Sequence, residues 1–234
     1  MRTVSEWSLE FDLLYNNITS NKAPGLTEYE KSVFLTRGQE TVVVGLYKGS
    51  FGDAFESTEE LTAYLGSLVK QADCSQVAAG YDVSAQKLSP DSVIYANPSD
   101  LLFRTWEGCT ITVDGCGSMQ ANVVPVTQDE FWRTSRDPFK KQNKSRVLRL
   151  SFATNSDTPT VYGQDIYSEL LSGYPITKYT VRYLSRPEPI ILQALTGGLS
   201  INGQTAAKTC KLDEALHQAI LAEAVRMAKA VWNT

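Results

Sequence analysis

The spacing of apolar residues changes twice along this chain, and this change limits the possible folds more than any single motif does. Apolar residues recur at helical spacing near both ends. Between residues 88 and 201, Pro and Gly instead separate short runs rich in Val, Ile, Thr and Tyr, a pattern typical of strands. Helices, then strands, then a helix indicate an α+β fold.

Capping sequences mark the expected starts of three N-terminal helices. Thr3–Glu6 and Thr27–Glu30 have the form of capping boxes, and Glu60 follows Ser57 at the same spacing. Asp213 is expected to cap one C-terminal helix. The predicted apolar faces are Trp7, Phe11, Leu14, Tyr15 and Ile18 in the first helix, Val33, Phe34, Val44 and Tyr47 in the second, Leu61, Tyr64, Leu65, Leu68 and Val69 in the third, and Leu216, Ile220, Ala224, Met227, Ala228 and Val231 in the last.

The middle of the chain is expected to form an inserted β-rich lobe. Six runs are predicted to be strands, at residues 93–95, 110–113, 120–126, 147–152, 165–171 and 177–184. Asp114-Gly115 suits a hairpin turn, and Thr127–Glu130 predicts a short helix. We therefore expect a helical bundle formed by residues 1–87 and 203–234, with residues 88–202 inserted as the β-rich lobe.

The sequence contains none of the common catalytic or cofactor-binding motifs. The single histidine, His217, lies inside the last predicted helix, where a structural role is expected. The four cysteines have no metal-ligand spacing, and Cys116 in a Gly-Cys-Gly turn is the one candidate nucleophile. No apolar stretch is long enough for a membrane span or a signal peptide. We expect no enzyme, no metal and no cofactor.

One stretch, residues 127–150, differs in charge from the rest of the chain. It carries seven basic and three acidic residues, whereas the whole chain of 234 residues has a net charge of −4 and residues 1–75 carry eleven acidic and six basic residues. A solvated loop, a contact with phosphates and a contact with an acidic neighbouring subunit are all compatible with such a segment, which we expect to be an extended arm. The candidate subunit or DNA contact residues are Arg133, Arg136, Lys140, Lys141, Lys144, Arg146 and Arg149.

Several separate stretches resemble a known protein family. They are Ala23–Thr36, Arg136–Lys141, Thr180–Leu192, Gly198–Ile201 and the run from Cys210 to Ile220. In this order they resemble the virion ring proteins of crAss-like bacteriophages of gut Bacteroidales. The architecture is also similar to the adaptor or tail-tubular proteins of podoviruses. In one place the chain departs from the pattern, because Gly38 stands where the family leads us to expect Ala, and a helix-interior Gly predicts that the second helix bends or ends early.

The resemblance implies a non-enzymatic structural protein, made in the host cytoplasm and incorporated into the tail or neck of the virion. It implies a homo-oligomeric ring of the head-to-tail connector, twelvefold to match the portal, with contacts to the portal and to neighbouring neck and tail rings. Such a ring takes part in the packaging, retention and ejection of the genome, and DNA passes through its lumen without sequence-specific contact. No membrane contact is expected.

Two other functions compete with this one. A stand-alone nucleic-acid-binding protein would use the basic segment, from residue 133 to residue 149, although such domains usually have a strongly basic overall charge. A small hydrolase would use Cys116 as its nucleophile, but no motif supplies a partner base.

Overall fold

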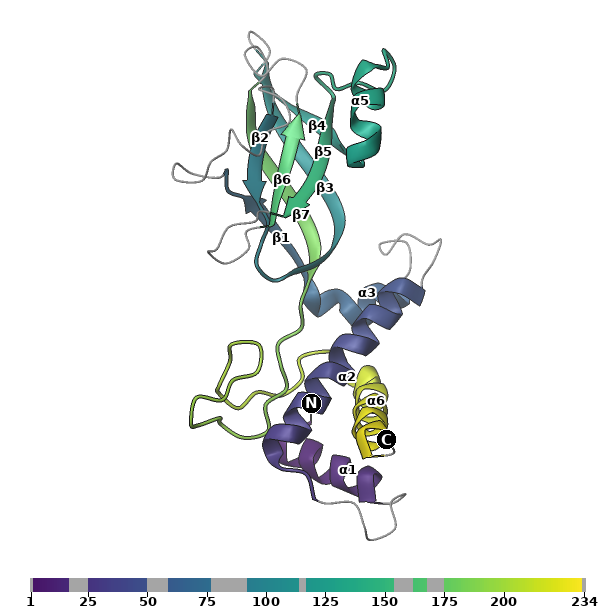
Figure 1. Cartoon of the computed structure of the whole chain (residues 1–234), viewed down its shortest axis with the longest axis vertical. Helices are drawn as coiled ribbons and strands as arrows, with labels where there is room; N and C mark the ends of the chain where they lie inside the picture. The colour runs from purple at the N-terminus through teal and green to yellow at the C-terminus, as the bar shows by residue number, and fades with distance from the viewer. Residues whose placement is uncertain are drawn as a thin grey trace. The chain divides into compact units, whose positions relative to one another are not determined.

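The chain folds into two compact units. The computed structural model describes residues 2–16, 25–49, 59–76, 92–113, 117–153, 162–167 and 175–232. One unit, here called the helical unit, contains residues 1–69 and 186–234, and the other, the β unit, contains residues 70–185 (Figure 1). The α+β class and the insertion of the β-rich part between two helical parts are thus confirmed.

The boundaries between the units lie earlier in the chain than the predicted 87/88 and 202/203. Val69–Cys74 forms a strand, β1, although Val69 was expected to end the third helix. Residues 186–202 belong to the helical unit, although they were expected in the β-rich lobe. Both differences arise because tertiary pairing, and not local pattern, decides where these segments pack.

Within the described residues, the helical unit contains the helices α1 (Val4–Asn16), α2 (Glu28–Gly49), α3 (Glu59–Leu65) and α6 (Glu214–Trp232). A single 3₁₀ turn, Gly66–Leu68, follows α3. Figure 1 shows α6 lying beside α2 and α1, so both ends of the chain form the bundle, as predicted. Its core contains Trp7, Phe11, Tyr15, Leu35, Val43, Leu65, Leu216, Ile220, Leu221, Ala224, Val225 and Ala228.

Two capping boxes form as predicted. The Thr27 backbone N–H donates to Glu30 Oε2 at 2.8 Å, and the Glu30 N–H donates back to Thr27 Oγ1 at 3.3 Å. Thr3 and Glu6 make the same reciprocal pair at 2.7 and 3.3 Å. These bonds lower the pKa of Glu6 and of Glu30, since they favour the ionised carboxylate. Ser57 and Ile18 lie outside the described residues.

Gly38 permits a close contact between α2 and α6. A Cβ atom at this position would lie 2.9 Å from the Ile220 carbonyl oxygen and 3.0 Å from the Ala224 nitrogen. The prediction that α2 ends early at Gly38 is wrong, because the helix continues to Gly49. Packing against α6 supports the helix through this position. At the other end of α6, the predicted core residue Val231 is 59% exposed, whereas Leu221 and Val225 are buried.

A chain segment without regular structure, residues 186–192, packs on α2 through polar side chains. Buried Ser32 accepts a hydrogen bond from the Leu192 N–H at 2.9 Å, and Gln39 donates to the Glu188 carbonyl at 3.1 Å. The Thr36 hydroxyl lies 3.2 Å from the Ile190 nitrogen, which donates to it. The buried face of α2 therefore includes neutral polar residues that the apolar pattern does not reveal.

The β unit contains a seven-stranded mixed sheet in the order β1-β7-β3-β4-β5-β6-β2. Its strands are β1 (Val69–Cys74), β2 (Ser92–Ala96), β3 (Leu101–Val113), β4 (Gly117–Pro125), β5 (Arg146–Ala153), β6 (Tyr162–Tyr167) and β7 (Ile176–Ser185). The pairings of β2 with β6, β3 with β4, β3 with β7 and β5 with β6 are antiparallel, and that of β4 with β5 is parallel. Each of the six predicted strands coincides with a strand of the sheet, although residues 168–171 of the fifth lie outside the described residues, and β3 begins well before its predicted start.

The sheet curls back on itself so that its two edges meet. Gln76, just after β1, pairs with Tyr95 of β2, and the Ala96 N–H donates to the Ser75 carbonyl at 3.0 Å. The inner face then encloses one core cluster, made of Cys74, Val93, Tyr95, Cys109, Ile111, Ala121, Val147, Ile176, Tyr179, Val181 and Tyr183. Strands β3 and β4 pair as the predicted hairpin requires, although its turn, Asp114–Cys116, lies outside the described residues.

Helix α5 (Gln128–Arg136) covers part of the sheet's outer face. Phe131 packs with Leu148 and Leu150 of β5 in a second cluster, separate from the inner core. Side chains alternate along a strand, so Val147 joins the inner core while Leu148 and Leu150 face α5. None of the helices within the described ranges is long and apolar enough to cross a membrane.

Candidate functional site

The basic segment, residues 127–150, has a defined fold. It consists of α5, two turns and the first half of β5. The expectation of an extended arm is therefore wrong, whereas the short helix predicted from Thr127–Glu130 is confirmed as α5. The segment is folded because Phe131, which is 2% exposed, packs on β5 and holds α5 there. The irregular spacing of the basic residues does not reveal this apolar contact.

The chain between α5 and β5, residues 137–146, is here called the basic turn, and its own hydrogen bonds hold it. The Asp137 carboxylate accepts from the Phe139 N–H at 2.8 Å, and the Asp137 carbonyl accepts from the Lys141 N–H at 2.9 Å. The Arg146 guanidinium donates to the Phe139 carbonyl at 2.9 Å. These contacts restrain the backbone on both sides of Phe139, whose side chain is 89% exposed.

Four of the predicted contact residues lie on the surface. Arg133, Arg136, Lys140 and Lys144 are exposed. The Arg133 side chain is 80% exposed and lies 3.1 Å from the Glu130 carboxylate, a pair of little energetic weight in water. Lys141 and Arg146 are half-buried at the base of the basic turn. These six residues lie on α5 and the basic turn, the segment that also exposes Phe139.

Arg149, the seventh predicted contact residue, is not on that surface. It is 8% exposed, its Nε lies 2.8 Å from the Glu107 carboxylate, and it donates to Ser151 Oγ at 2.6 Å. Burial lowers the pKa of Arg149, and the Glu107 charge opposes this effect. The expected contact role of Arg149 is therefore corrected, because its charge is already used inside the β unit.

Glu107 is the centre of this internal ionic cluster. The Tyr179 hydroxyl donates to Glu107 Oε2 at 2.8 Å, and Arg104 Nε lies 3.9 Å from the same carboxylate. Burial raises the pKa of Tyr179 above its ordinary value, so its hydroxyl remains a donor. The cluster satisfies charges that the sheet encloses, and stabilisation of the β unit is its evident role.

Aromatic side chains accompany the basic residues, and the sequence analysis did not single them out. Trp132 of α5 is 56% exposed and meets Phe131 edge to face, with ring centroids 5.4 Å apart. Phe139 extends from the basic turn. Exposed aromatics next to Arg are typical of protein–protein contacts. The sequence contained a usable sign, since Pro138-Phe139 interrupts a run of charged residues.

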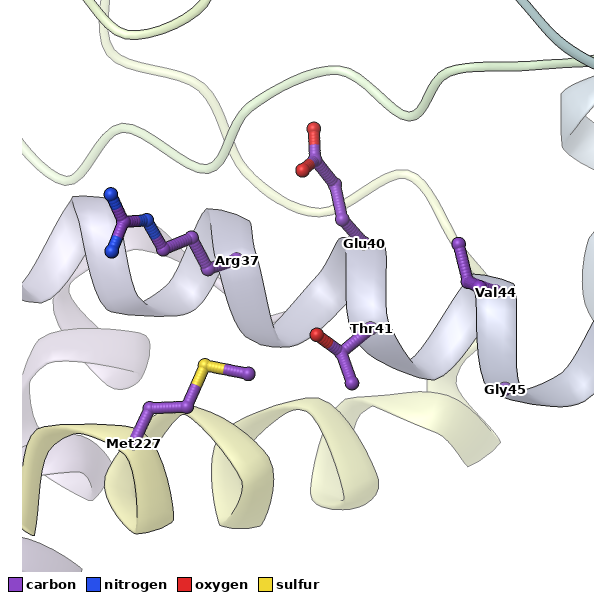
Figure 2. Close-up of a pocket in the computed structure, with 6 residues that line it drawn as sticks. All are labelled: Arg37, Glu40, Thr41, Val44, Gly45 and Met227. Carbon is purple, nitrogen blue, oxygen red and sulfur yellow. The ribbon is translucent and has the colours of Figure 1, made fainter. Parts of the chain in front are cut away.

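A separate open groove of about 480 Å³ lies between α2 and α6. Figure 2 shows Thr41 of α2 and Met227 of α6 directed into the space between the two helices. Arg37, Glu40, Val44 and Gly45 complete the lining. Glu40 accepts a hydrogen bond from Asn202 at 3.3 Å. The lining lacks a convergent set of catalytic groups, so it indicates no chemistry.

The candidate reactive residues within the described part of the chain are structural. His217 is 1% exposed and lies beside Trp7, with its Nε2 donating to the Leu212 carbonyl at 3.2 Å. Cys74, Cys109 and Cys210 are buried free thiols, and burial raises the pKa of Cys74 and Cys210 to about 11. No group of three metal-ligating side chains occurs among these residues. Cys116 lies outside them.

Comparisons with known proteins agree on one family. The profile of the family described as "Phage tail ring protein 3/4" matches residues 2–234. Ring protein 3 of Bacteroides phage crAss001 is 38% identical over 232 residues, which cover 97% of this chain and 94% of the relative. Ring protein 4/5 of the same phage is 32% identical over 236 residues, which cover 98% of this chain and 93% of the relative.

Proposed function

Because this chain belongs to the phage tail ring protein 3/4 family of crAss-like phages, whose members are structural virion proteins and not enzymes, we propose that its copies form one ring of the portal–tail connector. The ring is a closed homo-oligomer, twelvefold like the portal to which the neck is attached. It lies in the stack of neck and tail rings and lines part of the conduit that retains and releases the genome.

The observation that carries this proposal is the basic turn. In an isolated chain, the well-restrained loop leaves Phe139 89% exposed, which does not stabilise the chain, because apolar surface is stabilising only when it is removed from water. Arg133 and Arg136 of the preceding helix and Lys140 and Lys144 of the same turn are also exposed. An apolar anchor within a charged rim is the usual composition of a protein interface.

We assign this surface to a neighbouring protein and not to the DNA in the lumen. DNA must slide during ejection, and a ring of many phosphate-binding loops would hold it, because each phosphate contact adds to a multivalent grip. The helical unit offers the opposite charge, with ten basic and fourteen acidic residues. Contact with an acidic subunit surface therefore agrees better with the charges.

The test replaces Lys140, Lys141 and Lys144 together by Ser. Unmodified protein mixed with its cognate portal should form rings visible by negative-stain microscopy and mass photometry. The triple variant should assemble less well than the unmodified protein. Its assembly should weaken further between 50 and 150 mM salt, because screening weakens the remaining charge contacts. Its melting temperature should hardly change, since Lys140 and Lys144 are exposed.

A matched control removes three lysines that pair with carboxylates elsewhere, Lys70, Lys178 and Lys211. This control has the same net charge as the test variant and should assemble like the unmodified protein. Unmodified protein that remains monomeric with its portal would contradict the proposal. Intact rings of the test variant, together with a loss of duplex DNA affinity measured by fluorescence anisotropy, would assign the surface to DNA instead.

A further inference from the structure

The most exposed large apolar side chains of the described residues lie on two surfaces. Among the large apolar residues of the described segments, the three most exposed are Phe139 at 89%, Leu9 at 69% and Leu13 at 64%. Phe139 belongs to the basic turn. Leu9 and Leu13 lie one helical turn apart on α1, so they form a single apolar stripe, here called the α1 face.

The α1 face has the opposite charge to the basic turn. Helix α1 carries Glu6, Glu10 and Asp12 and no basic residue. Arg2 lies 2.9 Å from Glu10, and Lys31 lies 2.6 Å from Asp12. Lys31 is also shared with Glu28 at 2.9 Å, and Lys229 donates to the Leu14 carbonyl at 2.9 Å. Among the described residues, four carboxylates and three cations thus surround this helix, which leaves an excess of one negative charge.

We propose that the basic turn of one copy docks on the α1 face of the next copy, with Phe139 packed against Leu9 and Leu13. This inference rests on the proposed ring assembly and names the contact that builds it. The aromatic ring covers the two leucines, and Lys140, Lys144 and Arg136 meet the acidic residues around the stripe. Removal of these three apolar side chains from water supplies the affinity, and the opposite charges orient the two copies.

The two surfaces lie on different units of the chain, so the contact is heterologous: each copy offers one basic turn and one α1 face. Such a contact repeats from copy to copy and closes into a ring when the rotation between copies allows it. A two-fold pair would need both contacts to form reciprocally between the same two copies, whereas a ring needs only one such contact with each neighbour.

Two variants with complementary defects test the contact. The turn variant is Phe139→Ser, and the face variant is the double substitution Leu9→Ser and Leu13→Ser. All three side chains are exposed, so both variants should keep the melting temperature of the unmodified protein. With the portal present, each variant alone should assemble at least about 30-fold less well, which corresponds to the roughly 2 kcal/mol of a hot-spot residue at 1.4 kcal/mol per tenfold change.

Mixing the two variants without portal distinguishes this contact from others. The turn variant retains its α1 face and the face variant retains its basic turn, so one productive contact forms per pair. Native mass spectrometry should detect a species of twice the 25.8 kDa chain mass in the mixture, and in neither variant alone. No dimer in the mixture, or rings in the mixture, would overturn the proposal.

A control double variant, Leu199→Ser with Val231→Ser, removes two other exposed apolar side chains of the helical unit, which are 45% and 59% exposed. It should assemble normally, whereas assembly as poor as that of the face variant would overturn the assignment. The unmodified chain separates this inference from the proposed function. Rings of unmodified protein together with full assembly of both test variants would reject only the docking contact, while no rings of unmodified protein would reject ring formation itself.

Discussion

The helical unit and the β unit bury their polar groups in different ways. In the helical unit, neutral side chains such as Ser32 and Gln39 bond to the backbone of residues 186–192, and the buried Lys31 pairs with carboxylates that are partly exposed. In the β unit, two ionised groups, Glu107 and Arg149, pair inside the curled sheet. A lost neutral bond leaves one unsatisfied dipole, but a lost partner of an ion pair leaves a bare buried charge. The β unit should therefore be the more sensitive of the two to a single polar substitution.

The largest effect is expected for Glu107→Ala. Arg149 would keep its burial without its carboxylate, and Tyr179 would lose its acceptor. The free energy of unfolding should fall by about 3–5 kcal/mol, the usual cost of breaking one side of a buried ion pair. Urea unfolding followed by circular dichroism measures it. A loss below about 1 kcal/mol would show that the cluster is solvated and that the contrast between the units is false.

A smaller effect is expected for Ser32→Ala in the helical unit. The Leu192 N–H would lose its acceptor in a buried position, at a cost of about 1–3 kcal/mol. The same urea titration applies. Thr41→Ala, an exposed position of the same helix, is the control and should change the unfolding free energy by less than about 0.5 kcal/mol. Equal losses for Ser32→Ala and Glu107→Ala would remove the distinction between neutral and ionic burial.

A comparison within α2 uses its two interior glycines. Gly38→Ala places a methyl group against the backbone of α6, which cannot move aside cheaply, and should destabilise the protein by about 1–2 kcal/mol after the gain in helix propensity. Gly45→Ala meets no atom within 4 Å and should stabilise by about 0.5–1 kcal/mol. Melting temperatures that move in the same direction for both variants would contradict the close contact at Gly38.

The features that the sequence predicts correctly are local ones. The capping box at Thr27 involves residues three positions apart, and the stripe through Leu216 and Ile220 follows one helix. Both depend on spacing alone, so a pattern detects them.

The features that the sequence analysis misses depend on distant partners. Arg149 resembles its basic neighbours in sequence, but it is buried, and the Glu107 carboxylate on another strand pairs with its guanidinium. Gly38 was expected to interrupt a helix and instead admits Ala224 of a helix from the other end of the chain. The capping pattern at Thr127 predicted the helix α5, but it did not predict that Phe131 packs on Leu148 and Leu150 of β5. No local pattern specifies such pairings.

The pH dependence of the helical unit should reflect His217. Burial lowers the pKa of His217, and the nearby Arg2 charge acts in the same direction, so the folded protein holds this imidazole neutral. Below a pH of about 6.5 the unfolded chain binds a proton that the folded chain does not, and stability therefore falls as the pH drops through this value. The slope is at most about 1.4 kcal/mol per pH unit for one proton. Between pH 7 and 5, His217→Gln should lose less stability than the unmodified protein, and identical pH profiles in chemical denaturation would contradict this assignment.

The smallest effect separates two threonines that precede helices, one in each unit. Thr27 bonds to the backbone N–H of Glu30 and receives the Glu30 carboxylate in return, so Thr27→Ala should cost about 1 kcal/mol. Thr127 stands before Glu130 in the same sequence pattern, but its side chain makes no capping bond to α5. Thr127→Ala should therefore change the unfolding free energy by no more than a few tenths of a kcal/mol. The difference follows from what holds each helix: the start of α2 depends on its cap, whereas α5 is fastened by Phe131 on β5. Equal losses at both threonines, measured by urea unfolding, would mean that α5 relies on its cap after all and that the basic turn, which follows α5 directly, is less firmly held than its hydrogen bonds indicate.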